Sequence, residues 1–274
     1  MTAAAAMDWY EAERANLIAV VREAADRHRD AAVLAFCEAL WPFYHGRKHH
    51  ADWIEAHRLG VAAAVRANDP VAEARMRNQL ARAYIELHRD ADAEAELAAA
   101  GAAAALSDEP RARAVVLESE GVLALSRERF TDAASHFAGS LRINERIGDR
   151  RGTALECYHR ADALVRGGIA LGEAVALLER ALSTAEEIAD ETTAARASIV
   201  LGSARLRAGS PDQARHPLTR AAEAMRRRGQ PVKEIQALEL LADVAARTDD
   251  GPLAAECAQR LSALYAQTGK PLPG

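Results

Sequence analysis

The densest group of side chains that could bind a metal ion or transfer protons lies between residues 45 and 57. It contains four histidines, with Asp52 and Glu55 close by: His45, His49, His50 and His57. His50 and His57 are seven residues apart, so one face of a helix could carry both. We expect the link between two helices near Gly46, which would separate His45 from His49. There is no HExxH motif and no cysteine partner, so the spacing gives little support for zinc. We therefore expect this segment to be a solvated linker between helices, and a metal-dependent enzyme is the last of the functions considered.

Other sequence motifs typical of catalytic sites are absent. There is no GxSxG nucleophile motif and no GxxxxGK[ST] phosphate-binding loop. Cys37, Cys157 and Cys257 lie far apart without a CxxC pair, and their number is odd. This pattern favours a reducing compartment, in which a small buried thiol fills space. We therefore predict a protein that is not an enzyme and has no cofactor.

The composition indicates a foldable chain that binds neither nucleic acid nor a membrane. Half of the 274 residues are apolar, 27% are charged and only 4% are aromatic. The net charge of −5 argues against contact with phosphates, which depends on excess lysine and arginine. The segment 1–6 lacks the basic start of a signal peptide, and the longest near-apolar run, 97–106, is too short to span a bilayer. We expect a cytoplasmic protein.

Short turns recur along the chain at intervals of 39 to 41 residues. They are Asn68-Asp69, Ser107-Asp108, Gly148-Asp149, Ala189-Asp190, Gly229-Gln230 and Gly269-Lys270. Proline follows four of them, at Pro70, Pro110, Pro231 and Pro271. Proline there ends one helix and fits the first turn of the next, where its missing N–H costs nothing. A unit of about 40 residues is typical of helical repeats.

Small residues recur inside each unit at positions where two helices would touch. Gly202 is followed twelve residues later by Ala214 and sixteen residues later by Leu218, and the unit before residue 148 repeats this with Gly121, Ala133 and Phe137. Such residues let two helix backbones approach closely. The pattern resembles the tetratricopeptide repeat, which has a small residue at place 8, alanine at place 20 and a large apolar residue at place 24.

The tetratricopeptide resemblance implies an all-α fold, a right-handed α-solenoid of about six helix pairs preceded by one N-terminal helix. Residues 1–28 would form a leader and the first helix. Residues 29–69 would form an atypical first pair rich in aromatic residues and histidine. Residues 70–274 would form five units, all within a single continuous solenoid domain.

A second, local resemblance rests on about 50 residues near the N-terminus. Asp8 could cap a helix whose buried stripe would contain Trp9, Leu17, Val20, Val21 and Ala24. The aromatic segment 40–53 follows, with Trp41 where a small residue is expected. Together these segments resemble the start of the helical arm in actinobacterial STAND ATPases, including antibiotic regulatory proteins with an NB-ARC module. The resemblance implies a sensor arm for signal transduction and transcription regulation, either as a fragment or free-standing.

In tetratricopeptide arrays the first helices of successive units line a concave groove. Carried over to this sequence, that geometry exposes charged and polar residues, with an arginine recurring in several units: Arg75, Asn78, Arg82, Glu118, Tyr158, Asp162, Arg166, Arg196, Arg207, Glu239, Asp243 and Arg247. Guanidinium groups bind carboxylate or phosphate in a bidentate manner, and Asn78 could hold a peptide backbone. These residues would bind a protein, a peptide or a small anionic signal, or would pair with one another across adjacent helices.

Two further features bear on partners. After Gly269 the chain continues only to residue 274, so the apolar face of the last pair would lack a cover: Leu253, Ala254, Leu261 and Leu264. An uncapped solenoid end favours an end-to-end homodimer, so a self-association scaffold is the alternative function. The run Arg226-Arg227-Arg228 lies in a last helical turn, where cations suit the helix dipole.

Overall fold

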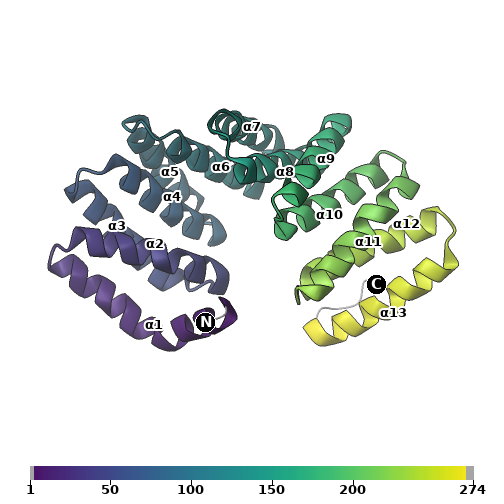
Figure 1. Cartoon of the computed structure of the whole chain (residues 1–274), viewed down its shortest axis with the longest axis horizontal. Coiled ribbons are helices and arrows are strands. Elements are labelled where there is room, and N and C mark those ends of the chain that lie inside the picture. Colours follow the sequence, from purple (N-terminus) through teal and green to yellow (C-terminus); the bar gives the residue numbers. More distant parts are fainter. Residues whose placement is uncertain (1–2, 270–274) are drawn as a thin grey trace. The chain divides into compact units, whose positions relative to one another are not determined.

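The computed structural model describes residues 3–269, and within them every regular element is an α-helix, as Figure 1 shows. The all-α prediction is confirmed. The helices in chain order are α1 (Ala3–Asp26), α2 (Asp30–Arg47), α3 (His50–Arg66), α4 (Pro70–Glu86), α5 (Asp90–Ala105), α6 (Pro110–Ser126), α7 (Phe130–Ile147), α8 (Arg150–Gly167), α9 (Leu171–Glu187), α10 (Glu191–Arg207), α11 (Pro211–Arg227), α12 (Pro231–Arg247) and α13 (Gly251–Thr268). None of the described helices is long and apolar enough to cross a membrane.

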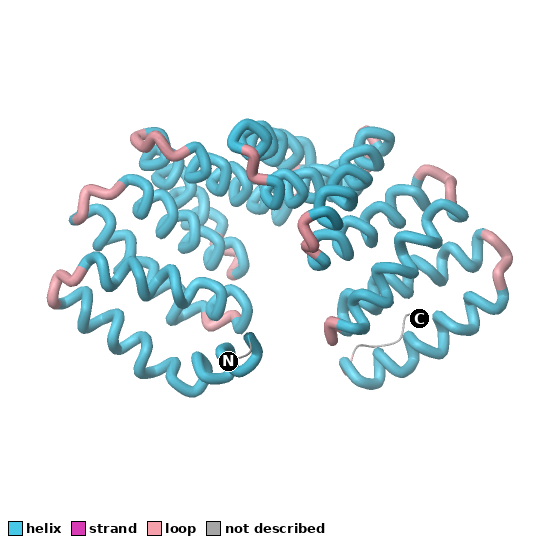
Figure 2. Tube along the Cα trace, in the orientation of Figure 1, coloured by secondary structure: helices cyan, strands magenta, loops and turns pink. Residues whose placement is uncertain are grey.

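The links between helices are short, and many are closed by the same device (Figure 2). Before each of the caps Asp69, Asp190 and Asp250 lies a residue with positive φ, and the aspartate N–H donates to a carbonyl five residues back. The aspartate carboxylate then accepts from a backbone N–H of the next helix, for example Ala72 N at 2.9 Å from Asp69. One residue therefore ends one helix and caps the next, which explains the regular turns in the sequence.

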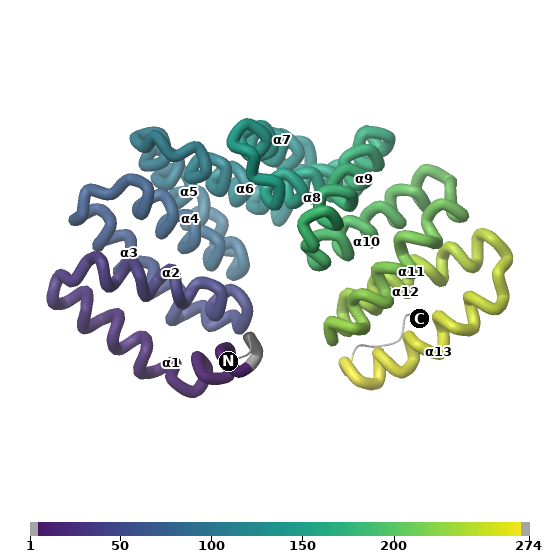
Figure 3. Tube along the Cα trace, in the orientation of Figure 1, coloured from purple at the N-terminus to yellow at the C-terminus, as the bar shows by residue number. Residues whose placement is uncertain are grey.

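The chain divides into two compact units, Met1–Arg127 and Glu128–Gly274, called here the N-terminal and the C-terminal unit. The division falls in the link between α6 and α7, which lies inside one of the predicted repeats. Figure 3 traces by colour the antiparallel hairpins that make up each unit. The prediction of a single continuous solenoid stays a prediction.

Aromatic side chains form the core of the N-terminal unit. Phe43, Tyr44 and Trp53 are fully buried, and α1 covers them with Ile18, Val21 and Ala25. The predicted stripe on α1 is wrong for two residues, because Trp9 is 50% and Val20 is 44% exposed. Asp8 does not cap α1 either. The helix begins at Ala3, so Asp8 lies inside it and its carboxylate pairs with Arg47 at 2.8 Å.

The link that follows α2 also differs from the prediction. The helix continues through Gly46 to Arg47, and Lys48, in the left-handed region, ends it. The backbone N–H of Lys48 donates to Tyr44 O, which satisfies a carbonyl of the last turn.

Alanine and leucine line the seams of the C-terminal unit. A Cβ added to Gly202 of α10 would lie 2.5 Å from Cδ2 of Leu218 in α11, which confirms the predicted close approach. The prediction of an uncovered apolar face on α13 is wrong for Leu261 and Leu264, which are buried in the same core cluster as α12. Leu253 packs against that cluster as well, and Ala254 is exposed. Residues 270–274, which follow, lie outside the described residues.

Candidate binding face of the C-terminal unit

Three helices of the C-terminal unit form an inner layer. The first helix of each hairpin packs against its counterpart in the next, so α8 contacts α10 and α10 contacts α12. The second helices, α9, α11 and α13, cover the other side of this layer. Two pockets open between α9 and α11 and between α11 and α13. Close contact on the inner side and open space between the outer helices is the packing expected of a unit that curves around its inner helices.

One cluster of charged side chains draws on all three inner helices. Tyr158, Asp162 and Arg166 come from α8, Arg196 from α10 and Lys233 from α12. Each interacts electrostatically with others of the set. Three cations therefore share this surface with one carboxylate. We call these five residues the inner-face cluster.

Partial burial perturbs the ionisation of the inner-face cluster. Burial raises the pKa of Asp162, although Arg166 and Lys233 act in the opposite direction. Burial also lowers the pKa of Lys233, and the neighbouring charge of Arg196 lowers it further, whereas Asp162 opposes the change. Burial and the charge of Asp162 raise the pKa of Tyr158 to about 12. For Asp162 and Lys233, the loss of water on burial therefore outweighs the stabilising effect of the opposite charges nearby.

The remaining predicted groove residues of this unit hold the repeats together. Arg207 donates from Nη1 to the carbonyl oxygen of Val165, in the preceding inner helix. Arg247 repeats this contact one unit later, with Nη1 3.0 Å from the carbonyl oxygen of Leu206. Asp243 pairs with Arg247 at 2.8 Å. Glu239 accepts a hydrogen bond from Tyr265 at 2.8 Å. Arg207, Arg247 and Glu239 therefore satisfy polar groups of neighbouring helices, and Asp243 pairs with Arg247 within α12.

Sequence reasoning found four of the five residues in the inner-face cluster and missed Lys233. The repeat spacing could have pointed to Lys233, because it lies 37 residues after Arg196, close to one repeat period. It stands in the first turn of α12, whereas Arg196 is in the second turn of α10. Residue spacing alone does not show that a side chain in the first turn reaches the same surface.

The N-terminal unit places its predicted residues on α4 and α6. Arg82 and Glu118 approach each other, with Nη1 and Oε1 3.8 Å apart. Burial raises the pKa of Glu118, and Arg82 opposes the shift. Within the described residues, the buried atoms Oδ1 of Asn78 and Nη1 of Arg82 make no hydrogen bond. Arg75 pairs with Glu38 of α2 instead.

Two of the four histidines in the 45–57 segment share one carboxylate, and the other two make contacts of their own. His57 is fully buried between the carbonyl oxygen of Trp53 and Oε1 of Gln79, each at 2.9 Å, and burial lowers its pKa to about 4. The Nε2 atom of His50 lies 2.8 Å from Glu86, that of His45 lies 4.0 Å from the same carboxylate, and that of His49 lies 2.9 Å from Glu11. Within residues 3–269, no three metal-binding side chains are grouped to hold an ion.

Trp41, which stands where a small residue is expected, packs edge-on against Trp53 with ring centroids 5.0 Å apart. The histidine-rich segment therefore serves as packing and as inter-helix pairing in the part of the chain described.

Comparison with known proteins gives one similar regulatory protein and several solved structures with a similar helical-repeat fold. No family model matches the chain. The regulatory protein AfsR of Streptomyces griseus is 26% identical over 256 residues, which is 93% of this chain and 25% of AfsR. The chain therefore spans a quarter of the length of that relative.

Three solved structures with similar folds are distant from the chain in sequence. BtubC (BKLC) from P. vanneervenii gives a TM-score of 0.70 at 19% identity, covering 82% of this chain and 94% of the other. The STAND protein PH0952 from Pyrococcus horikoshii, described as having a tetratricopeptide repeat sensor, gives 0.65 at 16% identity, covering 93% and 41%. A Rap protein in complex with Competence and Sporulation Factor gives 0.65 at 16%, covering 96% and 74%. The chain is a tetratricopeptide-like helical repeat protein that resembles the sensor arm of regulatory proteins.

Proposed function

We propose that the inner face of the C-terminal unit binds an acidic peptide or an acidic segment of a partner protein. The observation that carries this proposal is the inner-face cluster, in which Arg166, Arg196 and Lys233 outnumber Asp162 although the whole chain has a net charge of −5. An incoming carboxylate would relieve the repulsion between Arg196 and Lys233 and would meet donors that are already held by three helices.

The protein would act as a non-catalytic regulatory arm. The likeness to AfsR extends over nearly the whole chain, and the STAND relative is described as having a sensor of this repeat type. A Rap protein with the same fold forms a complex with Competence and Sporulation Factor. These likenesses support a role in which ligand binding to the arm controls an attached or associated ATPase or transcription regulator.

The N-terminal unit has a separate candidate contact for the backbone of a peptide. Its buried amide oxygen on Asn78 and the Nη1 atom of Arg82 make no hydrogen bond within the described residues. A buried polar atom without a hydrogen bond lowers the stability of the fold, and a ligand that supplies the hydrogen bond removes this cost. A peptide N–H would suit Asn78 and a peptide carbonyl would suit Arg82.

Fluorescence anisotropy with a labelled glutamate-rich peptide tests the charge preference. Because each charge-assisted hydrogen bond contributes about 1.5–3 kcal/mol, the double variant Arg196→Gln/Lys233→Gln should bind at least tenfold more weakly. The matched control is Arg142→Gln/Arg226→Gln, which removes the same charge from exposed residues of the outer helices α7 and α11.

A glutamine-rich peptide of the same length separates charge recognition from general peptide binding. Equal losses in the two double variants would show that only the net charge matters and would refute the proposed face.

A further inference from the structure

A pocket on the outer side of the C-terminal unit lies between α9 and α11, with α10 as its floor. Its volume is about 330 Å³, within the range of small-molecule sites. Half of its lining consists of alanine, and Leu182 and the buried Ser198 line it as well: Ala185, Ala189, Ala194, Ala195, Ala221 and Ala224. The alanines leave room for an apolar body.

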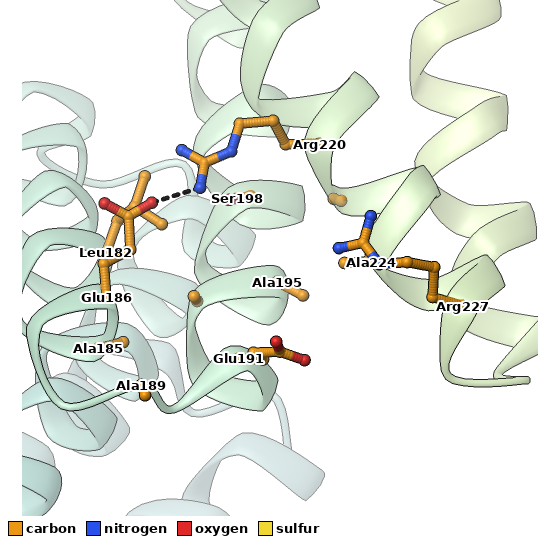
Figure 4. A pocket seen from close by; sticks show the side chains of 12 residues that line it. Leu182, Ala185, Glu186, Ala189, Glu191, Ala195, Ser198, Arg220, Ala224 and Arg227 are labelled. Atoms are coloured by element: carbon orange, nitrogen blue, oxygen red, sulfur yellow. Dashed lines mark hydrogen bonds and ion pairs between the residues drawn. The ribbon is translucent and has the colours of Figure 1, made fainter.

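Two arginines extend over this floor. Arg220 and Arg227 are seven residues apart on α11, so they lie on one face of the helix and both line the pocket (Figure 4). Arg220 pairs with Glu186 of α9 at 2.5 Å. Glu191, the other acidic residue of the lining, lies 3.4 Å from Arg228. Each carboxylate of the lining thus has an arginine partner.

Arg227 is the charged residue of the lining that has no partner of opposite charge in the part of the chain described. Among the described residues it is exposed and makes no ion pair or hydrogen bond. The lining has two arginines and two glutamates, but Arg228 pairs with Glu191 from outside the lining, so among these residues Arg227 is left without an anionic partner beside an apolar floor. A planar guanidinium in this setting suits a carboxylate or a phosphate group that accepts two parallel hydrogen bonds.

We infer that this pocket binds a small molecule with an apolar body and one carboxylate or phosphate group. The apolar body would rest on the alanine floor, and the anionic group would bind Arg227, with Arg220 and its partner Glu186 closing the far side. The site lies on the opposite side of the inner layer from the inner-face cluster, so it is a second site beyond the peptide face proposed above.

The neighbouring pocket, between α11 and α13, provides the control. It has a volume of about 410 Å³ and is lined by larger apolar residues, including Leu238, Leu241 and Leu253. Arg226 lines that pocket, whereas Arg227 lines the first one. Two adjacent arginines on one helix thus face two different pockets, and their variants carry the same change in charge.

The test is a titration of the full chain with 4-fluorobenzoate, followed by fluorine NMR, with phenyl phosphate and inorganic phosphate added in separate arms as competitors that displace the fluorinated ligand. Arg227→Gln should weaken 4-fluorobenzoate binding about tenfold, as expected for one charge-assisted contact, and Arg226→Gln less than twofold. Ala224→Leu, which fills the first pocket, should abolish binding, whereas Ala263→Leu in the second pocket should not. Circular dichroism checks that the variants are folded.

Each outcome decides the inference. Tighter binding of phenyl phosphate than of 4-fluorobenzoate would assign the site to phosphate esters, and the reverse order would assign it to carboxylates. Equal losses for Arg226→Gln and Arg227→Gln, or no binding of any organic anion at millimolar concentration, would overturn it. So would binding of inorganic phosphate as tight as that of the organic anions, since the alanine floor would then contribute nothing. None of these results depends on the acidic-peptide assay.

Discussion

Replacing Gly202 by alanine should destabilise the C-terminal unit, although alanine normally stabilises a helix. The added Cβ would lie 2.5 Å from Cδ2 and 2.8 Å from Cδ1 of Leu218, which is fully buried. Both distances are about 1 Å short of an ordinary contact between carbon atoms. Overpacking of this kind costs about 1–3 kcal/mol, against a gain of about 1 kcal/mol in helix propensity. The net change in the free energy of unfolding should be a loss of up to about 2 kcal/mol.

Gly172→Ala is the matched control. Gly172 lies in α9, and a Cβ there would meet nothing within 4 Å, so the same substitution should stabilise by about 0.5–1 kcal/mol. Urea unfolding followed by far-UV circular dichroism measures both variants. Tryptophan fluorescence reports separately on the N-terminal unit, because Trp9, Trp41 and Trp53 all lie there.

The clash with Leu218 can be isolated by a double-mutant cycle. Leu218→Ala alone should cost about 2–5 kcal/mol by opening a cavity. In the double variant the methyl group added at position 202 enters that cavity, so the two effects should couple by at least about 1 kcal/mol. A Gly202→Ala protein as stable as Gly172→Ala, or additive energies in the cycle, would refute the argument.

The remaining predictions concern a buried histidine and an arginine that donates to the backbone of a neighbouring helix. The folded-state pKa of His57, about 4, lies below its usual value of 6.5, so the unfolded chain binds the extra proton more readily and stability should fall as pH drops from 6.5 to 4, by up to about 1.4 kcal/mol per pH unit. Urea midpoints measured over that range should be less pH-dependent in His57→Gln than in His216→Gln, an exposed control; equal slopes would contradict the assignment. Arg207→Met should lower stability by about 1 kcal/mol, because the guanidinium donates to Val165 O of the preceding inner helix. Thermal melts should show no comparable loss for Arg142→Met, since Arg142 is exposed on α7.

The candidate site was only partly predictable, for a reason that Arg166 and Arg207 illustrate. Both are the last or next-to-last residue of an inner helix, and repeat spacing treats them alike. The guanidinium of Arg166 lies over the ring of Phe130, 5.3 Å from its centroid. Burial raises the pKa of Asp162, and the positive charge of Arg166 opposes that rise. Arg207 reaches back to a backbone carbonyl. Long side chains choose among partners that only the neighbouring helices bring within reach.

Arg227 shows the same limit on the outer side. Its place in the last turn of α11 suits the helix dipole, which is a sufficient reason for a cation in the sequence. Nothing in the sequence order indicates that it shares a pocket with Arg220 and alanines from α9 and α10, because those elements meet only after the hairpins stack.

The sequence by itself determined the helices, their short links and the seams between them. Those features depend on residue types that recur about every 40 residues along the chain: aspartates that cap helices, residues that accept positive φ, and small residues such as Gly202, which packs against Leu218. Only the packing of the helices shows which face of α1 is buried, which charges pair across helices and which do not. Those outcomes depend on the rotation of each helix about its axis and on contacts between residues about one or more repeats apart, which spacing along the chain does not encode.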